Sequence, residues 1–419
     1  MTRSTASLVL TLLAAPVAAP AAAAQGLPVV RPDSVDLAAS GLARVDSAMS
    51  AYVASGKVPG MVLAVARNGK LAHWKAFGMR SIEHRDPMER DDLFRIYSMT
   101  KPVTTAALMM LVEAGTVTLD DPVTKYLPVF ADVKVWSPAG LVAPRRAMTI
   151  RDLLQHTSGL TYGVFGETPV DSAYRKEGLM EPRRTLTELV DALAKLPLVG
   201  HPGEVWNYGF STDVAGRIIE VVSGMPLDRF MADRIFGPLA MKDTYFEVPA
   251  EKRARLTGYY GITNGPPALL DSPDTGSYTR RPVYLSGGGG LVSSAPDYLR
   301  FAQMILNGGE LDGVRLLRRE TVTSMLSNQL PASLIPLRVG TIVIPGTGFG
   351  LGFSVVVDPP VPGIADRGRA GWAGYANTYF FIDPTRQMIA MVLAQTFPFA
   401  EPATLEPDFR RLVYEAVRH

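Results

Sequence analysis

A serine and a lysine three residues apart, Ser98 and Lys101, are spaced for nucleophilic chemistry. Residues at this spacing lie on one face when they open a helix. The segment has the features of a helix start, because Pro102 is tolerated only in a first turn and residues 103–113 continue as a mostly apolar run. Ser98 would then have a free backbone N–H at the positive end of the helix dipole. Lys101 would lie within reach of the Ser98 hydroxyl and could shuttle its proton.

A tyrosine, Tyr208, is the second candidate. It lies in the stretch WNYGFS at residues 206–211, just before an expected helix, on a loop that can project a side chain. A phenol near a lysine ammonium ionises more readily and can serve as a general base. On spacing alone, a half-buried aromatic side chain that anchors the loop is the better interpretation.

Glycines bracket a third segment, AGWAGY at residues 370–375, which precedes an expected strand. Glycine at a strand start allows a substrate backbone to approach closely. A simple turn explains the same glycines about as well. The segment becomes a candidate substrate site only in combination with the other two.

Together, these three segments resemble the serine β-lactamase and penicillin-binding superfamily, whose signature begins with S-x-x-K. Three further stretches strengthen the resemblance, which spans nearly all of the mature chain. They are LLQHTSGLT at residues 153–161, GGGGLVSSA at 287–295 and FGLGF at 349–353. The order of these stretches along the chain and their residue sequences resemble those of family VIII carboxylesterases and class C β-lactamases.

The resemblance implies a role for each candidate residue. Ser98 would be the nucleophile, and Lys101 and Tyr208 its acid–base partners. The backbone N–H groups of Ser98 and Tyr375 would form the oxyanion hole. Such a site requires no metal and no cofactor. Which of Lys101 and Tyr208 is the base stays open, since the two are expected to titrate as a coupled pair.

Two positions depart from the β-lactamase pattern. Phe210 stands two residues after the tyrosine, where Asn is usual, and Trp372 opens the third motif, where Lys or His is usual. That cation helps to bind the carboxylate of a β-lactam, whereas Trp gives an apolar wall. We therefore expect the esterase branch, with Trp372, Gly374 and Phe210 at the substrate. Arg367 and Arg369 lie just upstream and could partly replace the cation.

Hydrophobic periodicity and turn residues predict the elements that position these residues. Thr149, Thr185 with Glu188, and Ser211 are expected to cap helices. Asn68-Gly69 is a strong two-residue hairpin signal. Helices are expected at residues 37–53, 98–113, 226–236, 296–306, 319–326 and 409–417, and strands at 61–66, 71–77, 350–357, 375–382 and 388–394.

Sheet at both ends of the chain and helices between them predict an α/β (α+β) fold. The resemblance implies the β-lactamase/transpeptidase-like form of this fold, an antiparallel sheet flanked by helices, plus an inserted all-α region. We predict an α/β domain from residues 25–97 and 285–419 and a mainly helical domain from residues 98–284. A cleft between them is the default place for a site.

The first 24 residues have the layout of a signal peptide. Arg3 precedes an apolar run at residues 8–19, and alanines at 22–24 supply a small-residue cleavage site. Pro16 and Pro20 break this stretch, which disfavours a membrane-spanning helix. We expect an exported protein, periplasmic or secreted, with no membrane span after cleavage.

Composition excludes several classes of protein. The chain has no cysteine, which excludes thiolate catalysis and Cys-ligated metals. Its net charge of +2, without a long Lys/Arg run, argues against a nucleic-acid partner. The histidines lack metal-binding spacing, His156 is interpreted as structural, and G-x-S-x-G does not occur. The glycines at residues 287–290 are explained better by close packing of a strand than by a phosphate site.

The sequence therefore predicts a serine hydrolase that cleaves small or short-acyl carboxylic esters through a Ser98 acyl-enzyme. The expected partner is a small-molecule ester, or a β-lactam. A class C-like β-lactamase or a D-amino-acid peptidase is the chemical alternative. A non-catalytic penicillin-binding-type module is the alternative of another class. The sequence gives no indication of the oligomeric state.

Overall fold

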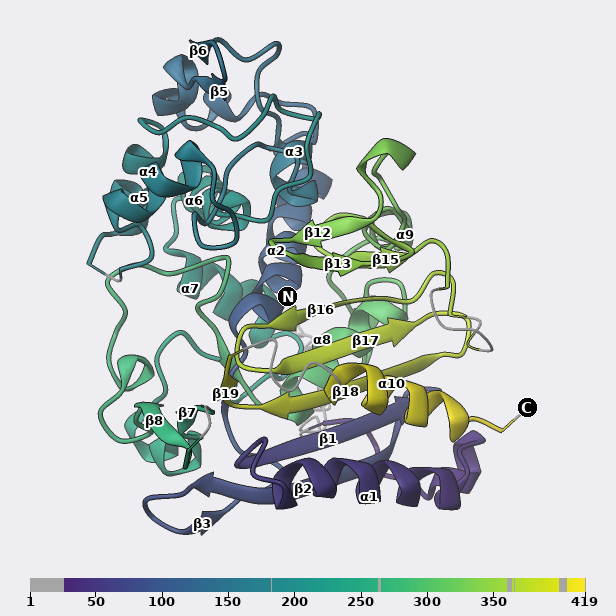
Figure 1. Ribbon diagram of the computed structural model, residues 1–419. Coiled ribbons are helices and arrows are strands. Elements are labelled where there is room, and N and C mark those ends of the chain that lie inside the picture. Colours follow the sequence, from purple (N-terminus) through teal and green to yellow (C-terminus); the bar gives the residue numbers. More distant parts are fainter. Residues whose placement is uncertain are drawn as a thin grey trace, which may run out of the picture.

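The computed structural model describes residues 26–418 except 182, 263–264, 360–363, 365 and 399–404, so the predicted signal peptide lies outside the described residues. An eight-stranded antiparallel sheet lies at the centre (Figure 1). In spatial order its strands are β14 (Thr347–Phe349), β15 (Ser354–Val356), β16 (Ala370–Gly374), β17 (Thr378–Asp383), β18 (Met388–Ala394), β1 (Gly60–Arg67), β2 (Lys70–Ser81) and β3 (Asp86–Pro87).

Strands from the two ends of the chain meet in the middle of this sheet. β1 pairs with β18 in antiparallel register, with Met61 opposite Ala394. β1 also pairs with β2 through the two-residue loop Asn68-Gly69, where φ is 52° and 74°. Positive φ at both loop residues is what a tight hairpin of this twist requires. The predicted hairpin and the predicted sharing of one sheet by both chain ends are confirmed.

The two faces of the sheet are covered by different helices. Met61, Leu63 and Val65 belong to a core cluster with α1 (Ala39–Ala54) and α10 (Leu405–Glu415), which pack against each other in front of the sheet in Figure 1. The alternate residues of β1 face the main core with α8 (Ala295–Leu306) and α2 (Thr100–Glu113). This period of two is the expected signature of a strand buried on both faces. The fold class predicted from the sequence is confirmed.

The helical region contains α3 (Ile150–Gln155), α4 (Pro169–Glu177), α5 (Leu186–Leu193), α6 (Ser211–Ser223) and α7 (Leu227–Met231), continued by a π-helical turn η5 (Ala232–Phe236). Thr149 and Thr185 form capping boxes, as expected. The predicted cap at Ser211 was wrong, because Phe210 is the N-cap of α6 and the Ser211 hydroxyl is hydrogen bonded to Ser158 at 2.7 Å. The domain boundaries remain a prediction.

Two strand predictions near the C-terminus need correction. Only β15 (Ser354–Val356) lies within the expected strand at 350–357. Residues 350–353 turn the chain between β14 and β15, because Gly352 adopts φ 77° and a Cβ there would lie 2.3 Å from Thr105 Oγ1. The expected strand at 375–382 begins only at Thr378, because Asn377 turns the chain with φ 60°. The third motif is itself a strand, β16, rather than the turn before one.

Smaller elements surround the sheet. β4 (Phe94–Arg95) pairs with β9 (Val292–Ser293), β12 (Leu337–Val339) with β13 (Ile342–Ile344), and β19 (Thr396–Phe397) joins β7 (Tyr259–Gly261) and β8 (Ala268–Asp271). The remaining pairs are β5 (Val135–Ser137) with β6 (Gly140–Val142) and β10 (Glu310–Leu311) with β11 (Val314–Arg315), and α9 (Arg319–Met325) follows them. Among the described helices, none is long and apolar enough to cross a bilayer.

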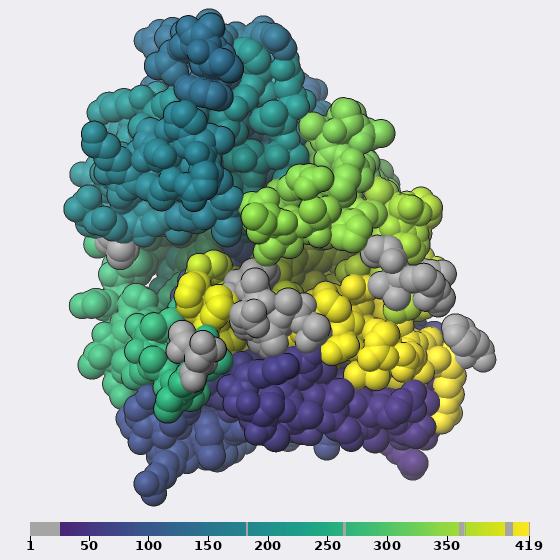
Figure 2. Space-filling view, in the orientation of Figure 1, coloured from purple at the N-terminus to yellow at the C-terminus, as the bar shows by residue number. Residues whose placement is uncertain are grey.

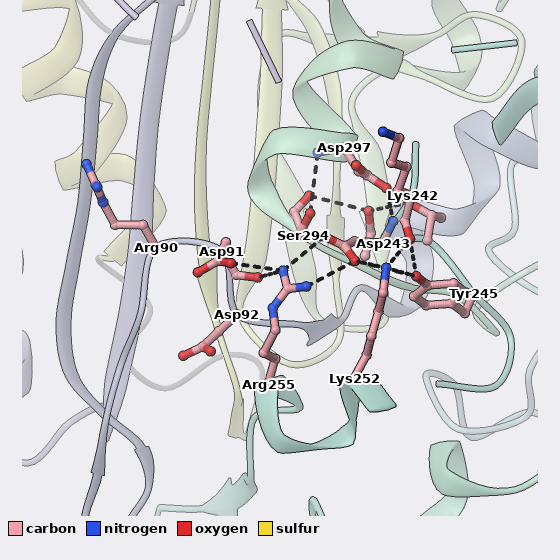
Figure 3. A network of polar contacts seen from close by, with 12 residues as sticks. Arg90, Asp91, Asp92, Lys242, Asp243, Tyr245, Lys252, Arg255, Ser294 and Asp297 are labelled. Atoms are coloured by element: carbon pink, nitrogen blue, oxygen red, sulfur yellow. Dashed lines mark hydrogen bonds and ion pairs between the residues drawn. The ribbon is translucent and has the colours of Figure 1, made fainter. Parts of the chain in front are cut away.

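A buried polar network joins the loop after α7 to the start of α8 (Figure 3). Asp243 accepts hydrogen bonds from Lys252 at 2.7 Å and from Arg255 at 3.0 Å. The backbone N–H of Asp243 donates to Asp297 at 2.6 Å. Both carboxylates are at most 1% exposed, so they depend on these partners for the solvation they lose.

Candidate active site

Ser98 and Lys101 meet at the start of α2. Ser98 lies in the single 3-10 turn η2 (Tyr97–Met99) that leads into the helix, and Lys101 Nζ donates to Ser98 Oγ at 3.1 Å. Tyr97, directly before the serine, adopts φ 41°, a conformation that a bulky residue holds only when its surroundings enforce it. Ser98 is half-buried and Lys101 is 1% exposed. The predicted proximity of the two side chains is confirmed.

The Lys101 ammonium has three hydrogen-bond acceptors. Besides Ser98, Nζ donates to the Tyr162 hydroxyl at 2.9 Å and to the Gly288 carbonyl at 2.6 Å. A lysine ammonium has three N–H donors, so each has one acceptor here. The Lys101 amine is therefore fully hydrogen bonded and points at the serine.

Tyr208 lies against this pair from the loop before α6. Its side chain is 8% exposed, and Lys101 Nζ lies 4.6 Å from the centre of its ring. The Trp372 indole N–H donates to the Tyr208 hydroxyl at 3.0 Å. In the described part of the chain, the Tyr208 hydroxyl makes no hydrogen bond to Ser98 or Lys101. Catalytic hydrogen bonds are often loose before substrate binds, and proximity without a bond fits that state.

Gly374 brings β16 close to the segment that carries Ser98. A Cβ at Gly374 would lie 2.3 Å from the Ile96 carbonyl oxygen, so only glycine allows this approach. Tyr375 follows at once, 40% exposed, with its ring 6.2 Å from that of Tyr97. The structure thus places the backbone of Tyr375 beside the serine-bearing turn, and its oxyanion role stays a prediction.

Aromatic side chains pack around Tyr208. The His156 ring lies 4.9 Å from the Tyr208 ring, and burial followed by the charge of Lys101 holds the pKa of His156 well below its usual value. A neutral histidine packed under the tyrosine fits the structural role that we expected. Trp206 stacks on Tyr208 at 6.2 Å, and Phe349 packs edge-on against Trp372 at 5.3 Å.

Three expected residues lie elsewhere. Phe210 is 1% exposed with its ring 4.6 Å from that of Tyr162, so it supports Tyr162 from the core instead of contacting substrate. Arg369 pairs with Asp366 at 2.8 Å, and Arg367 bonds to the Val357 carbonyl. Both guanidinium groups are thus bound to groups outside the site, and that of Arg369 also lies 5.6 Å from the centre of the Phe381 ring.

The contacts of three further residues in this cluster were not found from the sequence. Tyr162 and Gly288 are bonded to Lys101 but lie 61 and 187 positions from it in the chain. Asp213, on α6, accepts from Ser286 at 2.6 Å and from the Gly288 N–H at 3.1 Å. The available signal was their place beside motifs: Tyr162 directly follows LLQHTSGLT, and Gly288 lies in the glycine run.

Comparison with known proteins defines the family. The sequence model of the family described as Beta-lactamase matches residues 45–415. The chain belongs to this family. Protein Rv1367c of Mycobacterium tuberculosis is 36% identical over 87% of this chain and 96% of its own. Esterase EstB of Burkholderia gladioli is 30% identical over 86% of this chain and 91% of its own.

A solved structure of the family shares the fold closely. EstCE1, described as a hydrolase with promiscuous acyltransferase activity, superposes with a TM-score of 0.76 at 26% identity. The match covers 90% of this chain and 99% of EstCE1. The resemblance to the β-lactamase superfamily that we drew from the motifs is therefore confirmed, and the chain has the β-lactamase fold of known esterases and acyltransferases.

Proposed function

We propose that this protein is a serine carboxylesterase that cleaves small or short-acyl esters. The single observation that carries the proposal is the Ser98–Lys101 hydrogen bond of 3.1 Å with Tyr208 against the same ammonium. A half-buried hydroxyl held by a buried lysine is otherwise a costly arrangement for a folded protein. The names of EstB and EstCE1, an esterase and a hydrolase, support the same reaction class.

The reaction would follow from this geometry in two halves. The Tyr208–Lys101 pair removes the proton of Ser98 as its Oγ bonds to the ester carbonyl carbon. The oxyanion is stabilised by the backbone N–H groups of Ser98 and Tyr375. The leaving alcohol takes the proton, and an acyl-enzyme remains. Water then attacks the acyl carbon and gives a proton to the same pair. The pair passes this proton to Ser98 Oγ as the acyl–serine bond breaks, which releases the acid and the free serine.

Trp372 favours esters over β-lactams. Its indole stands where the β-lactamase pattern has a cation, and its N–H is used by Tyr208. Arg367 and Arg369 are held by other partners, as described above. A β-lactam carboxylate would therefore lack a charged partner from this strand, and we expect nitrocefin to be a poor substrate.

Acyl transfer to an alcohol is a second candidate. Figure 2 shows a recess between the helical region and the strands below it. Aromatic side chains gather at and next to the serine-bearing turn, with Tyr97 5.7 Å from Tyr259 and Tyr375 5.6 Å from Phe397 by ring centre. An apolar surface beside the serine would favour an organic acceptor over water. Formation of benzyl butyrate from p-nitrophenyl butyrate and benzyl alcohol would test it, and release of butyrate alone would oppose it.

Export remains part of the proposal, on the sequence of residues 1–24 alone. The protein recovered from the periplasm or medium of an expressing bacterium should begin at Gln25. An intact N-terminus on a cytoplasmic product would contradict it.

A fluorophosphonate probe tests the nucleophile directly. Peptide mass spectrometry after labelling should find the adduct on Ser98, and Ser98→Ala should abolish it. Failure of the wild-type protein to label, with the fold intact by circular dichroism, would favour a non-catalytic penicillin-binding-type module.

A further inference from the structure

Asp213 is a buried carboxylate that the proposed reaction does not use. It lies in the first turn of α6 and is 1% exposed. The Ser286 hydroxyl and the Gly288 N–H both donate to Oδ1. Burial raises the pKa of Asp213, and the charge of Lys101 opposes that shift. The carboxylate is thus held in the core facing the catalytic lysine.

Gly288 forms the first bridge between Asp213 and Lys101. Its N–H donates to Asp213 at 3.1 Å, while its carbonyl accepts from Lys101 Nζ at 2.6 Å. One residue therefore contacts both charges. A Cβ at Gly288 would lie 2.4 Å from Asp213 Oδ2 and 2.7 Å from the Tyr162 hydroxyl, so the bridge requires glycine.

Tyr162 forms the second bridge. Its hydroxyl accepts from Lys101 Nζ at 2.9 Å and lies on the same side of Gly288 as Asp213 Oδ2. Burial raises the pKa of Tyr162 well above its usual value, and the charge of Asp213 is the next cause. Tyr162 therefore stays a neutral phenol, able to give its proton to Asp213 while its oxygen accepts from Lys101.

A buried lysine ammonium needs a counter-charge. Lys101 is 1% exposed, and within the described residues its Nζ donates to two hydroxyls and a carbonyl but to no carboxylate. Asp213 is the carboxylate whose charge acts on it through the two bridges. The other titratable groups that face this cluster are Tyr208, Tyr284 and the neutral His156, and none of these supplies a carboxylate.

We propose that Asp213 is a positioning residue that keeps Lys101 protonated and aimed at Ser98, acting through Tyr162 and Gly288. The effect of Asp213 on catalysis, as opposed to its effect on Lys101, rests on the proposed hydrolase function. An ammonium has no lone pair to receive the Ser98 proton, so the proton passes to the phenolate oxygen of Tyr208, which becomes a neutral phenol. Lys101 stabilises the Tyr208 phenolate before this transfer and the developing negative charge on Ser98 during it, without itself changing protonation state.

The test compares Asp213→Asn with Ser286→Ala. The first removes the charge and keeps the shape, whereas the second removes one donor to the carboxylate and keeps the charge. Protein with ¹³C at lysine Cε reports the protonation state of Lys101 by NMR, and Lys101→Met identifies its signal. We expect the titration midpoint of that signal to fall by about one pH unit or more in Asp213→Asn. It should stay in place in Ser286→Ala.

Activity gives the second readout. In Asp213→Asn, kcat on p-nitrophenyl butyrate should fall about tenfold or more, with KM little changed and the alkaline limb of the pH profile displaced to lower pH. If Asp213→Asn does not fold, Tyr162→Phe removes one bridge and should move the NMR midpoint in the same direction by less. A Lys101 midpoint that is the same in every variant would overturn the inference.

The two proposals fail in different ways. Absence of ester turnover in the wild-type protein, with the expected NMR shift present, would reject the hydrolase function and leave the charge pairing intact. Normal turnover in the wild type with an unmoved Lys101 midpoint in Asp213→Asn would reject the role of Asp213 alone.

Discussion

At the scale of single residues, a neutral donor occupies the position that a cation has in β-lactamases. The Trp372 indole N–H is bonded to the Tyr208 hydroxyl at 3.0 Å. The sequence was sufficient to single out Ser98, Lys101, Tyr208 and Trp372 as candidates, because each lies in a short local motif. It was insufficient for the hydrogen bond between Trp372 and Tyr208, because 164 positions separate the partners and only the fold brings them together.

Trp372→Phe tests this hydrogen bond. The phenyl ring keeps an apolar wall but removes the donor to the tyrosine oxygen, which disfavours the phenolate. We expect kcat on p-nitrophenyl butyrate to fall about tenfold, the value of a hydrogen bond of about 1.5 kcal/mol to a charged group. The acid limb of the kcat/KM profile should move to higher pH.

Trp206→Phe is the matched control. Trp206 stacks on Tyr208, but its indole nitrogen is buried without a partner in the described structure. We expect Trp206→Phe to lower kcat less than Trp372→Phe does, and to leave the pH profile in place. Equal effects of the two substitutions would show that ring packing, and not the Trp372 donor, supports Tyr208.

Tyr208→Phe tests the base itself. Removing a general base lowers turnover by about 100- to 10,000-fold. The packing of the ring on Trp206 and His156 is kept, so the melting temperature should change little. Turnover within threefold of wild type, measured by p-nitrophenol release, would remove Tyr208 from the proposed mechanism.

At the scale of elements, close approaches of backbone explain the glycines. The run at residues 287–290 has no phosphate-site partner, and close packing was the interpretation favoured by sequence. The structure gives the reason at one position, because Gly288 fits between Asp213, Tyr162 and Lys101. The sequence could not show which glycine matters, since the neighbours that forbid a side chain come from α6 and from the loop after α3.

Gly288→Ala and Gly289→Ala form a matched pair. A Cβ at Gly288 would lie 2.4 Å from Asp213 Oδ2, whereas at Gly289 the nearest atom is 3.8 Å away. Overpacking of this kind costs about 1–3 kcal/mol. We expect Gly288→Ala to lower both the melting temperature and ester turnover. Gly289→Ala should leave both close to their wild-type values. Similar behaviour of both variants in thermal unfolding would contradict the account.

At the scale of the whole molecule, both ends of the chain build one sheet, and the site lies where the helical region meets it. The hairpin at Asn68-Gly69 and the final strands could be predicted because their patterns are local. The strand at 350–357 was wrongly predicted to begin at residue 350, because the packing of Gly352 on Thr105 in α2 turns the chain before β15 begins. Such long-range packing leaves no local pattern in the sequence.

The Asp297 network makes the stability of the fold depend on pH. Asp297 accepts from the Asp243 N–H and the Thr244 hydroxyl through one oxygen, and its other oxygen is buried without a partner. Burial raises the pKa of Asp297 from 3.8 to about 6. A raised pKa means that the folded state holds the proton of Asp297 more tightly than the unfolded state does. Protonation of Asp297 therefore stabilises the fold, and this stabilisation is complete below pH 3.8 and is lost as pH rises through about 6.

Urea unfolding at a series of pH values measures the effect. As pH rises from acid to neutral, the contribution of Asp297 to the free energy of unfolding should fall by up to about 3 kcal/mol. Asp297→Asn should flatten that part of the profile, whereas the same change at the exposed Asp120 should not. An unchanged pH profile in Asp297→Asn would contradict the assignment.

The central claim, an esterase built on Ser98, is tested most directly by kinetics of the purified protein on p-nitrophenyl butyrate and nitrocefin, with Ser98→Ala as control. The account predicts strong ester turnover and weak or absent nitrocefin turnover, both lost in Ser98→Ala. Ester turnover that persists in a folded Ser98→Ala protein would contradict the nucleophile. Faster turnover of nitrocefin than of the ester would contradict the esterase function and favour a β-lactamase.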